Sequence, residues 1–368
     1  MLLAYLVYSF VLFLLVFFGY WVSKKKAAKI NKIGVVVSVI LVSLVAGFRY
    51  NVGTDWEAYR TYYENILRYG MSWMEITTSS MEPLYLLLNK FIAFCGASYQ
   101  FFFTIIMLLH LVLLYKSFDQ YLFLLPWGLF FYVTMFFCMS LNIQRQTLSI
   151  CVFMYSLRFI LCRNFYKYCI CIIVAGLIHY SSFILFPVYF LSMGVFRFLD
   201  KRVVQLGLYL CSFFVFKYVL VFIELFVSNF IVNAKYLYNI SALGNVNMEI
   251  SSGLGVLVTI LIDIILILYS KRLSIVYSDY KFNVIFRVYF VGAVMSNIFG
   301  LDMFLSRLFL AMECLRFLIL AFFVYYLMRI KRTELTYVCG CSIILLYLLM
   351  YFVGIYNGHS GCAPYQFA

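Results

Sequence analysis

The stretch Leu2-Leu-Ala-Tyr-Leu-Val-Tyr-Ser-Phe-Val-Leu-Phe-Leu-Leu-Val-Phe-Phe-Gly-Tyr-Trp-Val22 is apolar almost throughout and is followed at once by Lys24-Lys-Lys26. A run of this length can cross a bilayer, which takes about 20 apolar residues. A cleavable signal peptide is disfavoured, because no basic segment precedes the run and no small-residue cleavage site follows it. We therefore expect a retained first span whose trailing lysines lie in the cytoplasm.

Similar apolar runs recur from one end of the chain to the other. Hydrophobic residues make up 66% and charged residues 11% of the chain, and the mean hydropathy is +1.01; soluble domains carry about 25% charged residues. We expect an all-α polytopic integral membrane protein with about twelve transmembrane helices, formed as a single transmembrane domain over residues 1–368. The expected spans are 2–22, 33–48, 99–115, 121–138, 147–162, 168–179, 183–196, 203–227, 254–270, 284–300, 308–328 and 336–356.

The net charge of +14 does not indicate nucleic acid, because the cations lie at the ends of apolar runs. If the first connection is cytoplasmic and the sides alternate, most lysines and arginines fall on the cytoplasmic side, as the positive-inside rule requires. This assignment depends on the run 83–94, which contains Lys90 and is too short to span. We interpret that run as an interfacial or re-entrant helix within an outer, periplasmic loop over residues 49–98.

The outer loop is expected to contain an amphipathic helix. Thr54-Asp-Trp-Glu57 fits a capping box, with Thr54 as N-cap and Glu57 at the third helical position. Gly70 suits the end of the helix. We expect it to lie on the membrane surface with its aromatic side down. Its apolar stripe is Trp56, Tyr59, Tyr63 and Ile66, and its charged face is Glu57, Arg60, Glu64 and Arg68.

A few polar side chains lie where the chain leaves the bilayer on the outer side. Arg145, in Gln144-Arg-Gln146, offers forked donors that match phosphate oxygens; an interfacial anchor is the alternative. His179, in His179-Tyr-Ser-Ser182, is a candidate general base, or a structural residue bonded to a carbonyl. Asp55 and Arg49 are further candidates, and Arg307 forms either a phosphate clamp or an ion pair with Asp302.

Other polar residues are interpreted as structural. Most of the cysteines lie within apolar runs and act as small hydrophobes. Glu313 and Arg316 fall three residues apart inside an expected span, which favours a buried ion pair. The three histidines are scattered and no Cys-x-x-Cys, Walker or HExxH motif is present, so we expect no metal and no cofactor.

Together these motifs resemble the EpsG-type branch of the Wzy polysaccharide polymerases. The resemblance covers about residues 45–365, and each motif alone is weak, but their order is specific. The motifs are, in order, Gly47-Phe-Arg49, Gly53-Thr-Asp55 with Tyr59, Glu82-Pro-Leu-Tyr85, Arg145-Gln146, Ala175-Gly-Leu-Ile-His179-Tyr-Ser-Ser182 with Pro187, Arg307, and Pro364-Tyr365.

The resemblance implies a GT-C-like glycosyltransferase of the bacterial inner membrane. Such an enzyme polymerises polyprenyl-pyrophosphate-linked repeat units, such as the O-antigen units of lipopolysaccharide biosynthesis, on the periplasmic face. A flippase and a chain-length regulator would be its partners, and membrane lipid its surroundings. Arg145, with Arg49 or Arg307, would bind the leaving pyrophosphate. The base would be His179 or Asp55.

Trp56 and Tyr59 would stack on sugars in this scheme, or else anchor the loop helix in the membrane. Three other classes stay open. A lipid-linked oligosaccharide flippase would place its arginines in mid-bilayer. An O-antigen ligase would use similar chemistry on the same side, and a secondary transporter would show repeat halves with sites at the midplane.

Overall fold

The computed structural model describes residues 1–24, 28–70, 81–215, 253–300 and 303–368. These residues are helical almost throughout, and the only β-type pairing among them is an isolated bridge between Arg49 and Phe367. A chain in lipid must satisfy its backbone donors and acceptors within each segment, which helices do. The described helices, with two π-helical segments (η2 and η6) and the 3₁₀ segments, are α1 (Leu2–Ser23), α2 (Ala28–Gly47), α3 (Trp56–Tyr69), α5 (Pro83–Phe94), α6 (Tyr99–Ser117), η1 (Leu122–Leu124), α7 (Leu125–Tyr132), η2 (Val133–Phe137), α8 (Cys138–Asn142), α9 (Gln144–Leu161), α10 (Phe165–Ile178), η3 (Tyr180–Ser192), η4 (Gly194–Asp200), the helix Arg202–Val215, α13 (Leu254–Val276), η5 (Ser278–Tyr280), α14 (Phe282–Phe299), α15 (Met303–Glu313), α16 (Arg316–Tyr325), η6 (Tyr326–Lys331), α17 (Glu334–Tyr356) and η7 (His359–Gly361).

Seven of the described helical stretches are long and apolar enough to cross a membrane, and an eighth is reached if the bent pair Tyr180–Ser192 and Gly194–Asp200 forms one span. The chain is therefore an all-α, multi-pass membrane protein. The expected count of about twelve is not reached among the described residues, because several expected spans are short helices. These are Ile33–Gly47, Phe165–Ile178 and Arg202–Val215; Pro83–Phe94, which was not expected to span, is also a short helix. The expected span 203–227 continues into residues that the structure does not describe.

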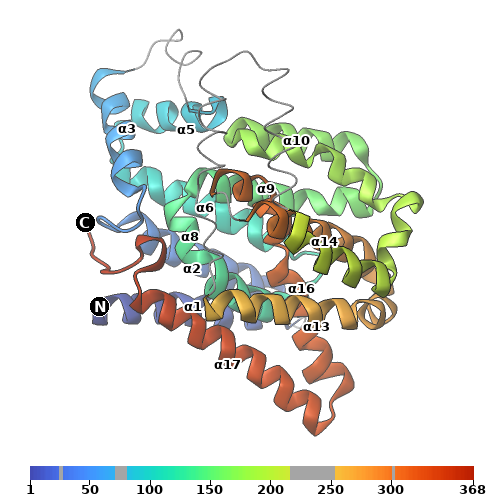
Figure 1. Cartoon of the computed structure of the whole chain (residues 1–368). Helices are drawn as coiled ribbons and strands as arrows, with labels where there is room; N and C mark the ends of the chain where they lie inside the picture. The colour runs from blue at the N-terminus through green and yellow to red at the C-terminus, as the bar shows by residue number, and fades with distance from the viewer. Residues whose placement is uncertain (25–27, 71–80, 216–252, 301–302) are drawn as a thin grey trace. The chain divides into compact units, whose positions relative to one another are not determined.

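The chain forms two compact units, Met1–Tyr189 with Phe317–Ala368, and Phe190–Arg316. In the first unit α1, α2, α6, α9 and α10 pack in sequence, each against the next. Gly47 permits the close approach of α2 to α6, since a Cβ there would lie 1.9 Å from Thr104 Oγ1. Helix α5 lies beside both α3 and α10 (Figure 1).

The C-terminal tail returns to the segment that follows α2. Backbone hydrogen bonds join Tyr50 N–H to the Gln366 carbonyl at 2.8 Å and Ala368 N–H to the Phe48 carbonyl at 2.8 Å. The Tyr8 hydroxyl of α1 donates to the Cys362 carbonyl at 2.7 Å. Both termini therefore lie at the same end of the first unit (Figure 1).

The second unit contains the buried ion pair expected at Glu313 and Arg316, whose side chains lie 2.9 Å apart. The sequence does not indicate the main partner of Arg316, which is Asp263 of α13. Its carboxylate accepts two hydrogen bonds from the Arg316 guanidinium, each 3.0 Å long, and hydrogen bonds from Tyr289 and Tyr209. Asp263 is 2% exposed. The buried guanidinium of Arg316 is tolerated because it is paired with carboxylates and hydrogen-bonded on several sides.

Candidate functional site

Three helix ends meet in the first unit and bring one polar side chain each. Glu82 precedes α5, which Pro83 starts because its fixed φ suits the first helical position. Arg145 lies in the first turn of α9. His179 ends α10, where its backbone turns to an extended conformation with φ −154° and ψ 115°. The two candidate residues that the sequence places on different helices are thus brought together.

Glu82 joins the other two side chains. Its Oε2 lies 2.6 Å from Arg145 Nη1, and its Oε1 lies 2.7 Å from His179 Nδ1. The Glu82 side chain is 5% exposed, whereas those of Arg145 and His179 are each 24% exposed. The carboxylate is therefore sealed behind two groups that remain open to an approaching ligand.

The charge state of Glu82 follows from its neighbours. Burial alone raises the pKa of this carboxyl, but the hydrogen bond from His179 and the positive charge of Arg145 lower it, and the pKa lies below its ordinary value of 4.5. Glu82 is consequently a carboxylate at neutral pH. Arg145 keeps a fixed counter-ion, so its guanidinium is held in place before any anionic ligand arrives.

The ionised Glu82 also fixes the tautomer of His179. A carboxylate can only accept hydrogen bonds, so Nδ1 of His179 must be the donor at this contact. In the neutral imidazole the other nitrogen, Nε2, is then an acceptor. Such a carboxylate–histidine pair orients the ring for proton transfer at Nε2.

Two tyrosines wall the cluster. The Arg145 guanidinium lies 5.6 Å from the ring centre of Tyr59 and 5.8 Å from that of Tyr85, and its Nε contacts the Tyr59 hydroxyl at 3.4 Å. Gln144 donates from Nε2 to the Tyr85 hydroxyl at 2.9 Å. Burial is the main cause that raises the pKa of Tyr59 and that of Tyr85. Both phenols therefore stay neutral, and they confine the guanidinium between aromatic faces.

Sequence reasoning did not assign Glu82, Tyr85 or Gln144 to the site. Glu82 and Tyr85 do occur in the motif Glu82-Pro-Leu-Tyr85. The signal that was overlooked is the position of Glu82, a carboxylate placed directly before the proline that opens a short apolar helix. A buried charge at such a place is unfavourable unless an oppositely charged group lies near it. The position of Glu82 therefore indicates a cationic partner.

Arg49 is placed differently from the prediction of a second phosphate ligand. It is 2% exposed, and its guanidinium donates to the carbonyls of Val52 at 3.1 Å, Leu141 at 3.0 Å and Ala46. These bonds tie the segment after α2 to the end of α8, one turn before Arg145. Arg49 thus stabilises the backbone that precedes Arg145, and its guanidinium N–H groups are bonded to main-chain carbonyls.

Asp55 directly precedes α3, and the expected capping box with Thr54 as N-cap is wrong. The residue at the N-cap is Asp55 and no side chain of its own caps the helix. Instead Asn142 Oδ1 accepts from the Asp55 N–H at 2.9 Å and from the Thr54 hydroxyl at 2.7 Å. A residue from the end of α8 therefore performs the capping, and it also holds Asp55 close to the start of α9.

The stripe of α3 is also placed differently from the expectation. Trp56, Tyr59, Tyr63 and Ile66 are all 5% exposed or less and pack into a core with α5 and α6, so they do not face lipid. Trp56 donates from its indole to the Arg49 carbonyl at 3.2 Å. Of the two aromatic residues expected to stack on sugars, only Tyr59 contacts the Glu82 cluster. The charged face is as expected, with Glu64 2.8 Å from Arg60 and 3.6 Å from Arg68.

Arg307 lies on α15 in the second unit and is exposed. Its expected partner Asp302 lies outside the described residues. The contribution of Arg307 to a site with Arg145 stays a prediction.

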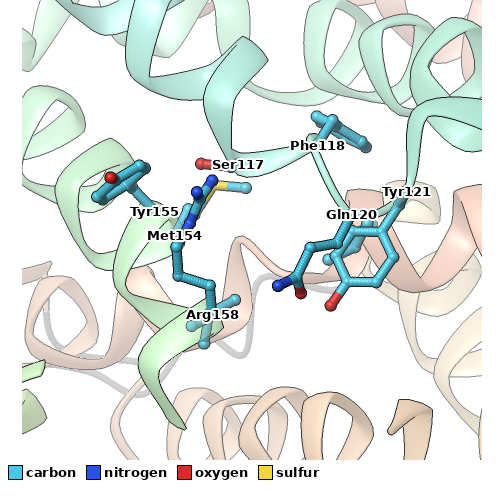
Figure 2. Close-up of a pocket in the computed structure, with 9 residues that line it drawn as sticks. Ser117, Phe118, Gln120, Tyr121, Met154, Tyr155 and Arg158 are labelled. Atoms are coloured by element: carbon cyan, nitrogen blue, oxygen red, sulfur yellow. The ribbon is translucent and has the colours of Figure 1, made fainter. Parts of the chain in front are cut away.

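Neither a metal-binding group of side chains among the described residues nor the small pocket at the other end of α9 adds to this cluster. Among the described residues, no group of three or more histidine, cysteine, aspartate or glutamate side chains could hold a metal ion. Figure 2 shows a pocket beside Arg158, at the other end of α9, lined by Ser117, Gln120 and Tyr155 among others. Its volume of about 10 Å³ admits about one water molecule, so it is no substrate site.

The comparison with known families agrees with the resemblance seen in the motifs. The model of the EpsG family matches residues 32–367, a range that contains the whole Glu82, Arg145 and His179 cluster. No curated protein and no solved structure gives a significant match. Because the match covers nearly the entire chain, the protein belongs to the EpsG family.

Proposed function

We propose that this protein is a glycosyltransferase that polymerises polyprenyl-pyrophosphate-linked oligosaccharide repeat units at the periplasmic face of the bacterial inner membrane. Membership of the EpsG family supports a polysaccharide-polymerase role in general. The observation that carries the specific proposal is the cluster of Arg145 and His179 on the buried carboxylate of Glu82. It supplies a ligand for phosphate oxygens and a proton acceptor within one site.

In this mechanism Arg145 binds the pyrophosphate of the lipid-linked donor. An acceptor hydroxyl attacks the anomeric carbon of the donor sugar while His179 Nε2 takes the hydroxyl proton. The new carbon–oxygen bond forms as the bond from the anomeric carbon to the pyrophosphate oxygen breaks. The leaving lipid pyrophosphate keeps the electron pair, and Arg145 stabilises its growing charge.

Glu82 acts through its two neighbours. It holds Arg145 and His179 in one geometry and stabilises the imidazolium that forms when His179 takes the proton. This resembles the part that the aspartate plays in a Ser-His-Asp triad, where the carboxylate orients the ring and is not itself protonated.

Vesicles that contain the purified protein and lipid-linked repeat units test the proposal. A ladder of extended chains on the lipid is expected, and it should disappear in Arg145→Ala and His179→Ala. The matched controls Arg68→Ala and His359→Ala, both at exposed side chains, should keep the ladder. Passage of the lipid across the vesicle without new glycosidic bonds would identify a flippase. Transfer only to an added lipid A core would identify an O-antigen ligase.

A further inference from the structure

An apolar groove of about 380 Å³ lies between α5, α6, α9 and α10 in the first unit. Its volume falls within the range of about 300 to 1,000 Å³ that is usual for small-molecule sites. No charged side chain lines it. Nine of its eleven lining residues come from the three helices that carry the polar cluster, and these nine include Leu84, Leu88, Leu148, Val152, Val174 and Ile178.

The groove begins where the polar cluster ends. On α9, Leu148 and Val152 follow Arg145 by three and seven residues, a spacing that puts all three on one helix face. On α10, Ile178 directly precedes His179. On α5, Leu84 lies two residues after Glu82 and is followed by Leu88 one turn later. All three helices thus lead from a polar end into an apolar channel.

The groove has a buried floor and partly exposed walls. Leu148, Val152 and Ile178 are 1%, 6% and 4% exposed, whereas Leu88 and Val174 are only half-buried. From Leu148 to Tyr155 the groove follows α9 for about 10 Å, at 1.5 Å per residue. One leaflet of the hydrocarbon core is about 15 Å thick, so the groove covers most of a leaflet's depth.

An occupant must therefore carry anionic oxygens at one end and a hydrocarbon chain directly behind them. A free glycan or a nucleotide has no hydrocarbon part to place in the groove, so the apolar walls would contribute nothing to its binding. A lipid pyrophosphate matches both parts, with its charged group at Arg145 and its chain beyond Leu148.

We infer that the groove binds the first isoprene units of the donor's lipid tail, next to the pyrophosphate. The inference rests on the proposed function, since it assigns the tail of that same substrate. It makes the groove the element that sets the depth of the donor, so that the anomeric carbon stands in front of His179. It also gives the spent lipid pyrophosphate a way back to the bilayer past the exposed wall of the groove.

Variants that fill the groove test this on the full-length protein. Val174→Trp and Leu88→Trp place a large ring in the channel. Ile173→Trp and Leu87→Trp add the same ring to neighbouring side chains that are 45% and 40% exposed and do not line the groove. Chain extension is measured with donors whose tails have many isoprene units and with donors whose tails have only one.

We expect the groove variants to raise KM for the long-tail donor at least about tenfold, because burial of two methylene groups already corresponds to that factor. The controls should stay near the wild type, and the groove variants should raise KM much less for the one-unit donor, because a single isoprene unit occupies only part of the groove. Unchanged KM for the long-tail donor, or an equal loss on both donors, would overturn the inference.

A second measurement does not depend on activity. An isoprenyl pyrophosphate with a photoreactive group on its second isoprene unit, but no glycan, should crosslink the wild-type protein within α5, α9 or α10 around the groove. Crosslinks only elsewhere, in a protein that polymerises, would refute the groove and leave the function standing. Groove crosslinks in a protein that does not polymerise would refute the function and leave the lipid site standing. Equal labelling of the groove by a phospholipid that carries the same photoreactive group would show that ordinary membrane lipid fills it and would overturn the inference.

Discussion

Replacement of Glu82 by glutamine probes the site most directly, because it changes one oxygen into an NH₂ group and preserves the shape of the side chain. In the wild type both oxygens of Glu82 accept, one from Arg145 at 2.6 Å and the other from His179 at 2.7 Å. Glutamine offers one acceptor and one donor. If the amide nitrogen faces Arg145, two donors meet; if it faces His179, the imidazole must switch tautomer so that Nδ1 accepts and Nε2 carries the proton.

The magnitude follows from burial and charge. Truncation of one member of a buried ion pair costs about 3 to 5 kcal/mol when the other charge is left sealed. Arg145 and His179 each keep 24% exposure and can recover some hydration, so we expect a loss of about 2 kcal/mol in the free energy of unfolding. Loss of the correct tautomer should lower kcat by about 10² to 10⁴, the usual contribution of a positioned base.

The assay is the rate of chain extension in vesicles, with the thermal unfolding of the purified protein as a check on folding. Glu57→Gln is the matched control, since Glu57 is exposed and lies on the same loop. The control should extend chains at the wild-type rate. A Glu82→Gln variant that folds and keeps its rate within about threefold would refute the role given to this carboxylate.

Four other outcomes are expected. Arg145→Lys should recover little chain extension, because lysine provides a point charge in place of a fork, and wild-type rates in this variant would count against pyrophosphate binding. His179→Gln can still donate to Glu82 and should fold normally but lack activity; if it polymerises, Asp55 becomes the better candidate base. Asp263→Asn should lower the free energy of unfolding by about 3 kcal/mol, because it leaves Arg316 without its main counter-ion, and an unchanged melting curve would contradict this. Because the pKa of Glu82 is lowered in the folded protein, its stabilising contribution is complete above its ordinary value of 4.5 and is lost as the pH falls through the lower, folded-state pKa. Unfolding curves over that acidic window should therefore show a loss of stability that is larger in the wild type than in Glu82→Gln, and equal slopes would argue against the shift.

Local patterns predicted much of the helical framework. The helix α3, its end at Gly70 and its ion pairs follow from spacing within a few residues, and so does the pair of Glu313 and Arg316. The amphipathic pattern of α3 predicts that its apolar stripe contacts lipid, whereas the stripe packs against protein. The sequence of α3 cannot distinguish contact with lipid from contact with a protein core, because both surroundings accommodate large aromatic side chains such as Trp56 and Tyr63.

Contacts between side chains that lie far apart in the chain could not be predicted from the sequence, for a related reason. Glu82 is 63 residues from Arg145 and 97 from His179, and no periodicity links them. The same holds for Asn142, which caps α3 from 87 residues away and displaces the capping box that Thr54 and Glu57 would form locally. A local motif states which bonds a segment can make alone, and a nearby side chain with better geometry overrides it.

The placement of Glu82 between an arginine and a histidine also links the two halves of the proposed reaction. One carboxylate holds both groups, through Oε2 to Arg145 and through Oε1 to His179. A pyrophosphate bound at Arg145 would therefore lie beside His179, and an acceptor hydroxyl that donates to Nε2 would lie next to the leaving group. In the proposed mechanism, activation of the acceptor and departure of the lipid pyrophosphate thus depend on one pair of side chains that Glu82 holds together, and a change at Glu82 should disturb both.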